Sequence, residues 1–194
     1  MSTILLLLAS AIFFIGFVMY NKGMFAGKNT PAFTAWAVFS VITFVNCLTY
    51  LGWTATWINI MLLFTDFIIC FFTSIFILIR IGWKVHIDWK DKLVVAISLA
   101  AILLWVIYNA AAYGNLFNQI AYSVAFIPTY RNVWNNPRNE PTRVWFVWTI
   151  AFVLNIVALV IQPTTQTMDY VSPVVCLVHH VAVTILSMRK MKIK

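Results

Sequence analysis

The chain has 194 residues, of which 63% are hydrophobic and only 9% are charged, and its mean hydropathy is +0.92. This composition excludes a soluble globular protein and indicates an integral membrane protein. A net charge of +8 would suggest nucleic acid as a partner in a soluble protein, but here the basic residues follow the membrane topology, so we expect no nucleic-acid partner.

Seven apolar segments are long enough to be predicted as transmembrane helices. A helix needs about 20 residues to cross a hydrocarbon core of roughly 30 Å. Helices are expected because lipid offers no hydrogen-bond partners to the backbone. In chain order, the predicted helices cover residues 3–20, 31–51, 54–79, 93–113, 116–130, 144–161 and 168–188. The first segment lacks a cationic leader, which favours a helix over a cleaved signal peptide.

All thirteen basic residues lie on one side of this predicted topology. They follow the first, third and fifth helices or end the chain, and the connections after the second, fourth and sixth helices contain none. All the loops are short, which is the regime in which Lys and Arg mark the cytoplasmic side. The prediction is therefore an amino terminus outside the cell and a carboxyl terminus in the cytoplasm.

Two polar loops resemble each other: residues 20–31 read YNKGMFAGKNTP and residues 127–141 read IPTYRNVWNNPRNEP. The paired positions, at offsets of 110 or 109 residues, are Tyr20 with Tyr130, Asn29 with Asn139, Pro31 with Pro141, Trp36 with Trp145, and Asn46 with Asn155. The first three helices thus repeat as the last three, and the unpaired fourth helix returns the chain so that both triplets run in the same direction.

This repeat predicts an all-α polytopic membrane protein in which two parallel three-helix bundles are joined by a linker helix. Residues 1–80 form the first repeat, residues 81–115 a cytoplasmic loop and the linker helix, and residues 116–194 the second repeat with a basic tail. Parallel repeats are related by an axis along the membrane normal, with the substrate site at their interface.

The 3+1+3 arrangement, with prolines near two helix junctions, resembles the sugar-transporting SWEET family and its PQ-loop relatives. Pro128 in IPTYR stands near the position where PQ-loop proteins carry Pro-Gln, although Thr129 replaces the Gln. The run AFIPTYRNVWNNP is similar to a group of small bacterial membrane proteins with an F-I-P-T-x-R signature. These resemblances cover the whole chain and imply a transporter fold in a bacterial inner (plasma) membrane.

Polar residues inside the predicted spans are the candidate substrate-binding residues, because they are costly in lipid unless they face a cavity or a partner. Asp66 is the sole acid deep in a helix, and His179 and His180 lie at a similar depth in the seventh helix. Asp66 either binds a solute or proton, or is a structural acid hydrogen-bonded between helices. Adjacent helical residues point about 100° apart, so only one of the two histidines can face a cavity squarely.

Two symmetric pairs complete the predicted substrate-binding set. Asn46 and Asn155 contact the solute or else form bonds between helices. Trp36 and Trp145 line the cavity as a pair or else pack in the core. Both alternatives stay open on the sequence alone.

Three prolines are predicted gating residues: Pro31, Pro128 and Pro141. Pro128 should kink the fifth helix because its ring removes one bond of the helical ladder. Pro31 and Pro141 suit the first turn of the helices that they begin. Tyr20 and Tyr130 are interpreted as members of a cytoplasmic aromatic belt.

The predicted function is a transporter or facilitator of a small polar solute, namely a sugar, a vitamin or a cation, by alternating access and with or without proton coupling. The alternative is a non-transporting accessory or assembly subunit. The sequence contains no phosphate-binding glycine loop and no metal-spaced histidine pair, so we expect no enzyme, cofactor or metal. The expected partners are the solute, the lipid bilayer, and either further copies of this chain or a larger membrane complex.

Overall fold

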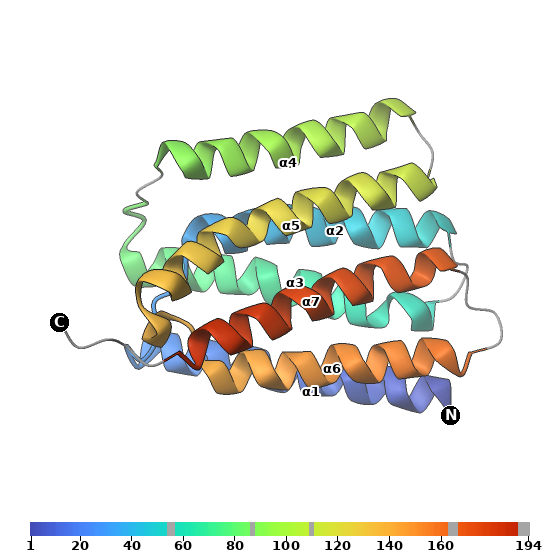
Figure 1. Cartoon of the computed structure of the whole chain (residues 1–194), viewed down its shortest axis with the longest axis horizontal. Coiled ribbons are helices and arrows are strands. Elements are labelled where there is room, and N and C mark those ends of the chain that lie inside the picture. The colour runs from blue at the N-terminus through green and yellow to red at the C-terminus, as the bar shows by residue number, and fades with distance from the viewer. Residues whose placement is uncertain (54–56, 86–87, 109–110, 163–166, 190–194) are drawn as a thin grey trace.

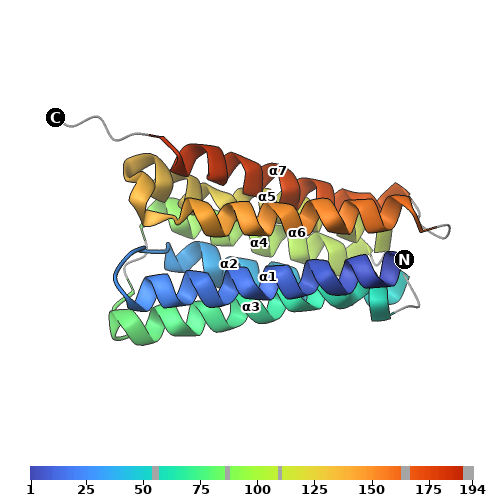
Figure 2. The same cartoon turned by 90° about the horizontal axis from the view of Figure 1, so that it is seen from below.

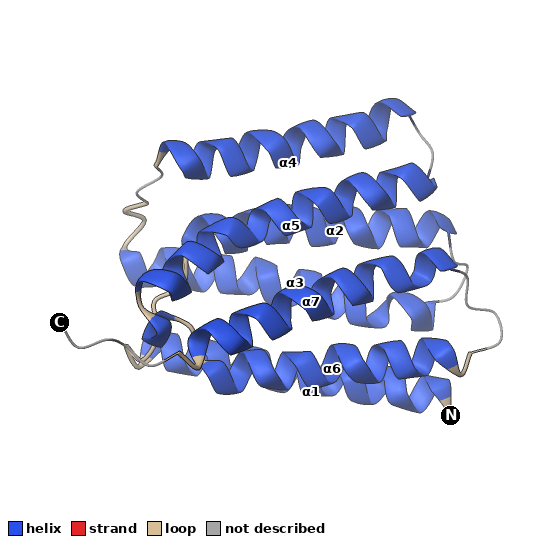
Figure 3. Cartoon of the chain, viewed as in Figure 1, coloured by secondary structure: helices blue, strands red, loops and turns tan. Residues whose placement is uncertain are grey.

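The computed structural model describes residues 1–53, 57–85, 88–108, 111–162 and 167–189. Every regular element in this part of the chain is helical (Figure 3). The α-helices are α1 (Ser2–Phe25), α2 (Phe33–Trp53), α3 (Trp57–Ile81), α4 (Trp89–Tyr108), α5 (Ala111–Asn135), α6 (Thr142–Val160) and α7 (Val171–Ser187), with 3-10 helices η1 (Pro137–Asn139) and η2 (Thr167–Tyr170) before α6 and α7. Each of the seven predicted helices is confirmed as a helix.

The helix boundaries differ from the prediction where local hydrogen bonds decide them. α4 begins four residues earlier than predicted, because the Asp88 carboxylate accepts a hydrogen bond of 2.7 Å from the backbone N–H of Asp91 and so caps the first turn. α1 continues past Tyr20 to Phe25. It ends where Gly27 takes a φ of 71°, the left-handed conformation that commonly terminates helices.

Three helices in the described part of the chain are long and apolar enough to cross a membrane: Ser2–Phe25, Ile60–Ile81 and Thr142–Val160. Phe33–Leu48 and Val171–Ser187 are apolar but shorter. The molecule is thus an α-helical protein with membrane-spanning character.

The helices lie roughly side by side, and the start of α1 and the end of α7 lie at opposite ends of the bundle (Figure 1). The α1–α2, α3–α4 and α5–α6 connections share one end. The described Lys and Arg residues all belong to these connections, to the neighbouring helix ends or to the segment after α7. We call this the basic end, and the end with the amino terminus the opposite end.

Packing between helices follows a regular pattern. α1 packs against α3 and α6, α2 packs against α3 and α5, and α7 packs against both α5 and α6. Figure 2 shows α1, α2 and α3 on one side and α5, α6 and α7 on the other. α4 lies at the edge, against α5 and more slightly against α2.

The core between these helices is rich in aromatic rings. Phe13, Trp145, Trp148 and Phe152 are buried, and the Phe13 and Phe152 rings meet edge to face at 5.2 Å. α1 approaches α6 closely at Gly16, where a Cβ atom would lie 2.3 Å from the indole nitrogen of Trp148. Small residues at such contacts let helix backbones come together.

The three prolines occupy different local positions. Pro128 lies inside α5, which continues to Asn135 with its last turns bent away from the rest of the helix (Figure 1). Pro141 is the residue that caps α6, and Pro31 lies two residues before α2. Both therefore precede the first helical turn, and the prediction that they lie within it is wrong by one or two residues.

Candidate functional site

A small cavity lies in the aromatic core of the bundle, and we call it the central cavity. The volume that the centre of a water molecule can occupy in it is about 10 Å³, room for roughly one water. Its lining residues are Phe13, Trp36, Phe39, Asp66, Ile69, Cys70, Tyr122, Phe126, Trp145, Trp148 and His180. Four of the predicted substrate-binding residues, Trp36, Asp66, Trp145 and His180, thus meet around one space.

Asp66 supplies the only carboxylate in this lining. It lies on α3 with 4% of its surface exposed, and its Oδ1 atom accepts a hydrogen bond of 3.4 Å from the thiol of Cys70 one turn later. The rest of the lining is largely aromatic or aliphatic, so an ionised carboxylate here would attract a cation or a polar hydrogen strongly.

His180 lies on the far side of the cavity, on α7. Its Nδ1 atom is 2.7 Å from the carbonyl oxygen of Cys176, so this nitrogen donates the hydrogen bond. The rings of Phe152 and Trp145 pack against the imidazole at 4.8 Å and 5.1 Å between centroids. These contacts fix the ring, and Nε2 is left as the nitrogen able to accept a hydrogen bond.

His179 occupies a different environment and does not line the central cavity. Its ring stacks on Phe126 with 4.4 Å between centroids and an interplanar angle of 8°. Nδ1 lies 2.5 Å from the hydroxyl of Tyr130, and Nε2 lies 3.0 Å from the hydroxyl of Ser123. His179 therefore connects α7 to α5, while its neighbour faces the cavity.

Asn46 and Asn155 are buried but also lie outside the central cavity. The Asn46 amide donates a hydrogen bond of 2.8 Å to Ser172 on α7, and its carbonyl oxygen accepts one of 3.3 Å from Gln119 on α5. Asn46 therefore links α2, α5 and α7 by hydrogen bonds near the opposite end.

A buried acid that sequence reasoning missed holds two of the three cavity tryptophans, Trp36 and Trp145, in place. Glu140, 1% exposed, accepts hydrogen bonds from the Tyr20 hydroxyl (2.9 Å), the Trp145 indole (3.0 Å) and the Asn132 amide (3.2 Å). Tyr20 in turn accepts a bond of 3.2 Å from the indole of Trp36. We call these five residues the Glu140 cluster.

The Glu140 cluster overturns the interpretation of Tyr20 as a belt residue. Tyr20 is fully buried, because its hydroxyl finds partners inside the protein and its ring packs against Trp36 and Trp148. A sequence signal for Glu140 did exist. It is one of only five acids in the chain, and it stands directly before Pro141 in the most polar loop.

A larger, open space lies at the basic end, and we call it the vestibule. The volume available to the centres of water molecules is about 660 Å³. Pro31 and Pro128 are among the lining residues. Pro141, the third predicted gating residue, is not. Polar and charged side chains from α4 and α5 face this space, which makes it chemically unlike the central cavity.

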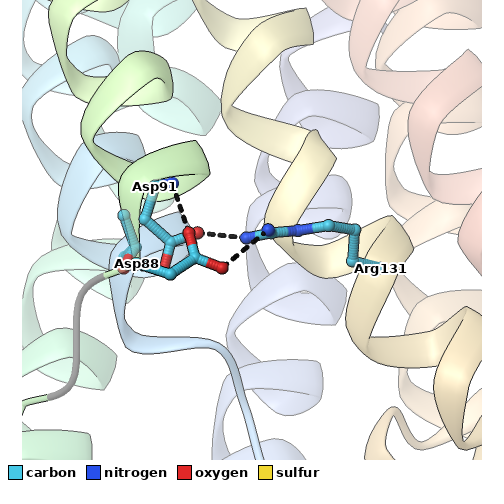
Figure 4. Close-up of polar contacts among 4 residues, drawn as sticks. Asp88, Asp91 and Arg131 are labelled. Carbon is cyan, nitrogen blue, oxygen red and sulfur yellow. Dashed lines mark hydrogen bonds and ion pairs between the residues drawn. The ribbon is translucent and has the colours of Figure 1, made fainter.

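Arg131 in the vestibule lining joins α5 to the start of α4 (Figure 4). Its guanidinium forms ion pairs with Asp88, at 3.0 Å, and with Asp91. The backbone N–H of Asp91 and then the nearby guanidinium hold the pKa of Asp88 below its ordinary value of 3.8. The three residues form a partly exposed tie for α4, in which one guanidinium faces two carboxylates.

Comparisons with protein families, with curated proteins and with solved structures find no match for this chain. The similarity to SWEET and PQ-loop proteins therefore stays a prediction. Within the described residues, no group of three or more His, Cys, Asp or Glu side chains could hold a metal ion.

Proposed function

We propose that this chain is a membrane transporter or facilitator of a small polar solute, with the central cavity as its binding site. The observation that carries this proposal is the meeting of Asp66, His180 and the tryptophans Trp36 and Trp145 around one internal space. Small-molecule sites combine apolar and aromatic walls with a few converging polar groups. Residues that are costly inside a membrane tend to mark such pathways.

The pattern of helix contacts supports two parallel three-helix repeats as the moving parts. Exchanging α1 with α5, α2 with α6 and α3 with α7 leaves the main contacts among these six helices unchanged. The contact of α1 with α6 becomes that of α5 with α2, and the α3 contacts become the α7 contacts. This is the relation expected for repeats 1–80 and 116–194 about an axis along the membrane normal, with α4 within the linker 81–115.

The lining favours a cationic or strongly hydrogen-bonding solute. One carboxylate, one imidazole and several aromatic faces attract a small cation both by charge and by cation–π contact. The central cavity has room for only about one water, so this conformation is a closed state. Binding of a larger solute requires the two halves to separate at one end, which is the rocking motion of alternating access.

A second candidate is a non-transporting accessory or assembly subunit. The observations that favour it are the small volume of the central cavity and the position of Asn46, which bonds helices together outside that cavity. In this role Asp66 is a structural acid, and the chain's partners are further membrane subunits.

The proposed location is a bacterial inner membrane crossed seven times, with the amino terminus outside. All thirteen Lys and Arg residues then lie on the cytoplasmic side, as expected for short loops. The basic end of the bundle is the cytoplasmic end in this orientation.

The deciding experiment is a thermal-shift screen of the purified protein against sugars, vitamins, amino acids and small cations. A ligand that binds only the folded state raises the melting temperature in proportion to its occupancy. The transport proposal expects at least one solute to do so in the wild type and to lose most of its effect in Asp66→Asn. A stable protein that responds to no solute, but co-purifies stoichiometrically with another membrane protein, supports the accessory role.

A further inference from the structure

Glu140 lies where two polar loops and three helices converge at the basic end. The carboxylate accepts bonds from α1 through Tyr20, from α5 through Asn132 and from α6 through Trp145. The backbone N–H of Thr30 donates to the carbonyl of Asn139 at 3.1 Å, so the loop after α1 also bonds to the loop after α5. The two halves are therefore tied together here.

The Glu140 cluster also forms one wall of the central cavity. The rings of Trp36 and Trp145 line that cavity, while their indole N–H groups are bound by Tyr20 and by Glu140. A solute moving between the central cavity and the basic end must displace this wall. The carboxylate thus holds both tryptophans, one directly and the other through the Tyr20 hydroxyl.

We propose that Glu140 is the proton-binding group of a gate at the basic end, and that the change in its protonation controls access to the central cavity. This inference rests on the proposed transport function, and it assigns the proton to the gate and not to Asp66. The groups that contact Glu140 are a phenol, an amide and an indole, of which only Tyr20 is titratable. Both ion pairs found among the described residues involve Arg131, so no cation of that part of the chain pairs with Glu140.

The direction of the pH effect follows from burial. Burial raises the pKa of Glu140 from 4.5 to about 7, and the hydrogen bonds from Trp145, Tyr20 and Asn132 only partly oppose this. Opening the gate to water returns the pKa toward 4.5, so the closed state binds the proton more tightly. By linkage, proton binding at Glu140 favours the closed gate fully below pH 4.5. This preference weakens as the pH rises from 4.5 and is lost above about pH 7, so the gate opens more easily over this range.

The test measures access to the central cavity through Cys70, which lines it. A protein with Cys47→Ala and Cys176→Ala keeps Cys70 as its single thiol. In lipid nanodiscs, where both faces are accessible, its reaction rate with a small quaternary-ammonium thiosulfonate is measured from pH 5.5 to pH 8. The same series in the Glu140→Gln background cancels the pH dependence of the thiol itself.

We expect the labelling rate, divided by that of Glu140→Gln at the same pH, to rise about tenfold or more across this range, as the two pKa values require by linkage. Asp169→Asn is the matched control, because Asp169 is also a buried acid but precedes α7 at the opposite end. It should keep the wild-type response. Tyr20→Phe removes one donor to the carboxylate and its link to Trp36, and should speed labelling at pH 5.5.

A ratio that stays flat within about twofold, or an Asp169→Asn effect equal to that of Glu140→Gln, overturns the proposal. If Glu140→Gln does not fold, the labelling rate of Tyr20→Phe at pH 5.5 is the test. An unchanged rate in Tyr20→Phe would show that the Glu140 cluster does not act as a gate. Cys70 labelling needs no solute, so it tests the gate independently of the thermal-shift screen. A pH-dependent labelling rate together with no ligand in that screen would support the gate while the transport proposal fails.

Discussion

Cys70 and His180 face the same cavity from α3 and α7, and they stand 110 residues apart, the offset that pairs Tyr20 with Tyr130. One turn earlier, Asp66 and Cys176 have the same spacing. Asp66 accepts a bond from Cys70, and the carbonyl of Cys176 accepts one from His180. At this spacing the acid Asp66 pairs with a cysteine, and one turn later a cysteine pairs with the imidazole of His180, so the two sides of the cavity differ chemically.

The first prediction concerns Asp66. Asp66→Asn keeps the shape of the side chain and removes the only carboxylate in the cavity lining. We expect the variant to remain folded and to bind a cationic solute about tenfold or more weakly, a loss of about 1.4 kcal/mol. Uptake into vesicles with and without an imposed pH gradient gives the corresponding transport measurement.

Asp169→Asn is the control for this prediction as well, because it removes a buried acid outside the central cavity. Unchanged binding and uptake in Asp66→Asn would assign Asp66 a structural role. Loss of the folded protein itself would lead to the same conclusion, since it would identify Asp66 as a buried polar tie between helices.

The helical elements were accessible from the sequence because lipid leaves the backbone few options. Apolar length alone predicted each of the seven helices. The ends were less predictable, since they depend on single polar contacts such as the cap that Asp88 provides to α4. Hydropathy also placed Lys90 and Lys92 in a loop, whereas both lie in the first turn of that helix.

The site was predicted only in part, for a geometric reason. Depth along a helix can be read from the sequence, but the direction of a side chain depends on which neighbour each face meets. Depth alone did not separate His179 from His180, and it placed Asn46 with the cavity residues although Asn46 bonds α2 to α7. Glu140 was missed because a polar loop residue is ordinarily solvated, and its burial depends on contacts 120 residues away in sequence, at Tyr20.

The second prediction concerns orientation. A single cysteine at Gly114, between the fourth and fifth predicted spans, should react with a membrane-impermeant thiol reagent applied to intact cells. A cysteine at Asn136, in the loop beside the basic residues, should not react until the membrane is opened. The reverse pattern would contradict the assignment of the basic end to the cytoplasm.

The third prediction concerns the tie between α4 and α5. Arg131→Gln removes both ion pairs, which are partly exposed and so contribute little. We expect the melting temperature to fall by only about 1–3 °C at low salt, and the difference to shrink at high salt. Arg138→Gln, which removes an exposed cation outside both ion pairs, is the control and should leave the melting temperature unchanged.

Acid should weaken the same tie. The pKa of Asp88 is lowered in the folded protein, so its contribution to stability is complete above the ordinary value of 3.8 and is lost as the pH falls through the lowered pKa. The Arg131→Gln variant should therefore show a smaller loss of stability on acidification below pH 4 than the wild type. An equal loss in both proteins would show that the guanidinium does not contribute to the shift.

The fourth prediction concerns the contact between α1 and α6. A methyl group at position 16 would lie 2.3 Å from the indole nitrogen of Trp148, which donates a bond of 2.9 Å to the carbonyl of Phe13. Gly16→Ala must therefore move either the Trp148 ring or the helix, although alanine is the better helix former. We expect a net destabilisation of about 1–3 kcal/mol, typical of an overpacked core.

Leu8→Ala, at an exposed position of α1, is the control and should change stability much less. Because Trp148 lines the central cavity, Gly16→Ala should also alter Cys70 labelling at every pH. Unchanged stability and unchanged labelling together would show that α1 and α6 do not pack as closely as Gly16 and Trp148 indicate.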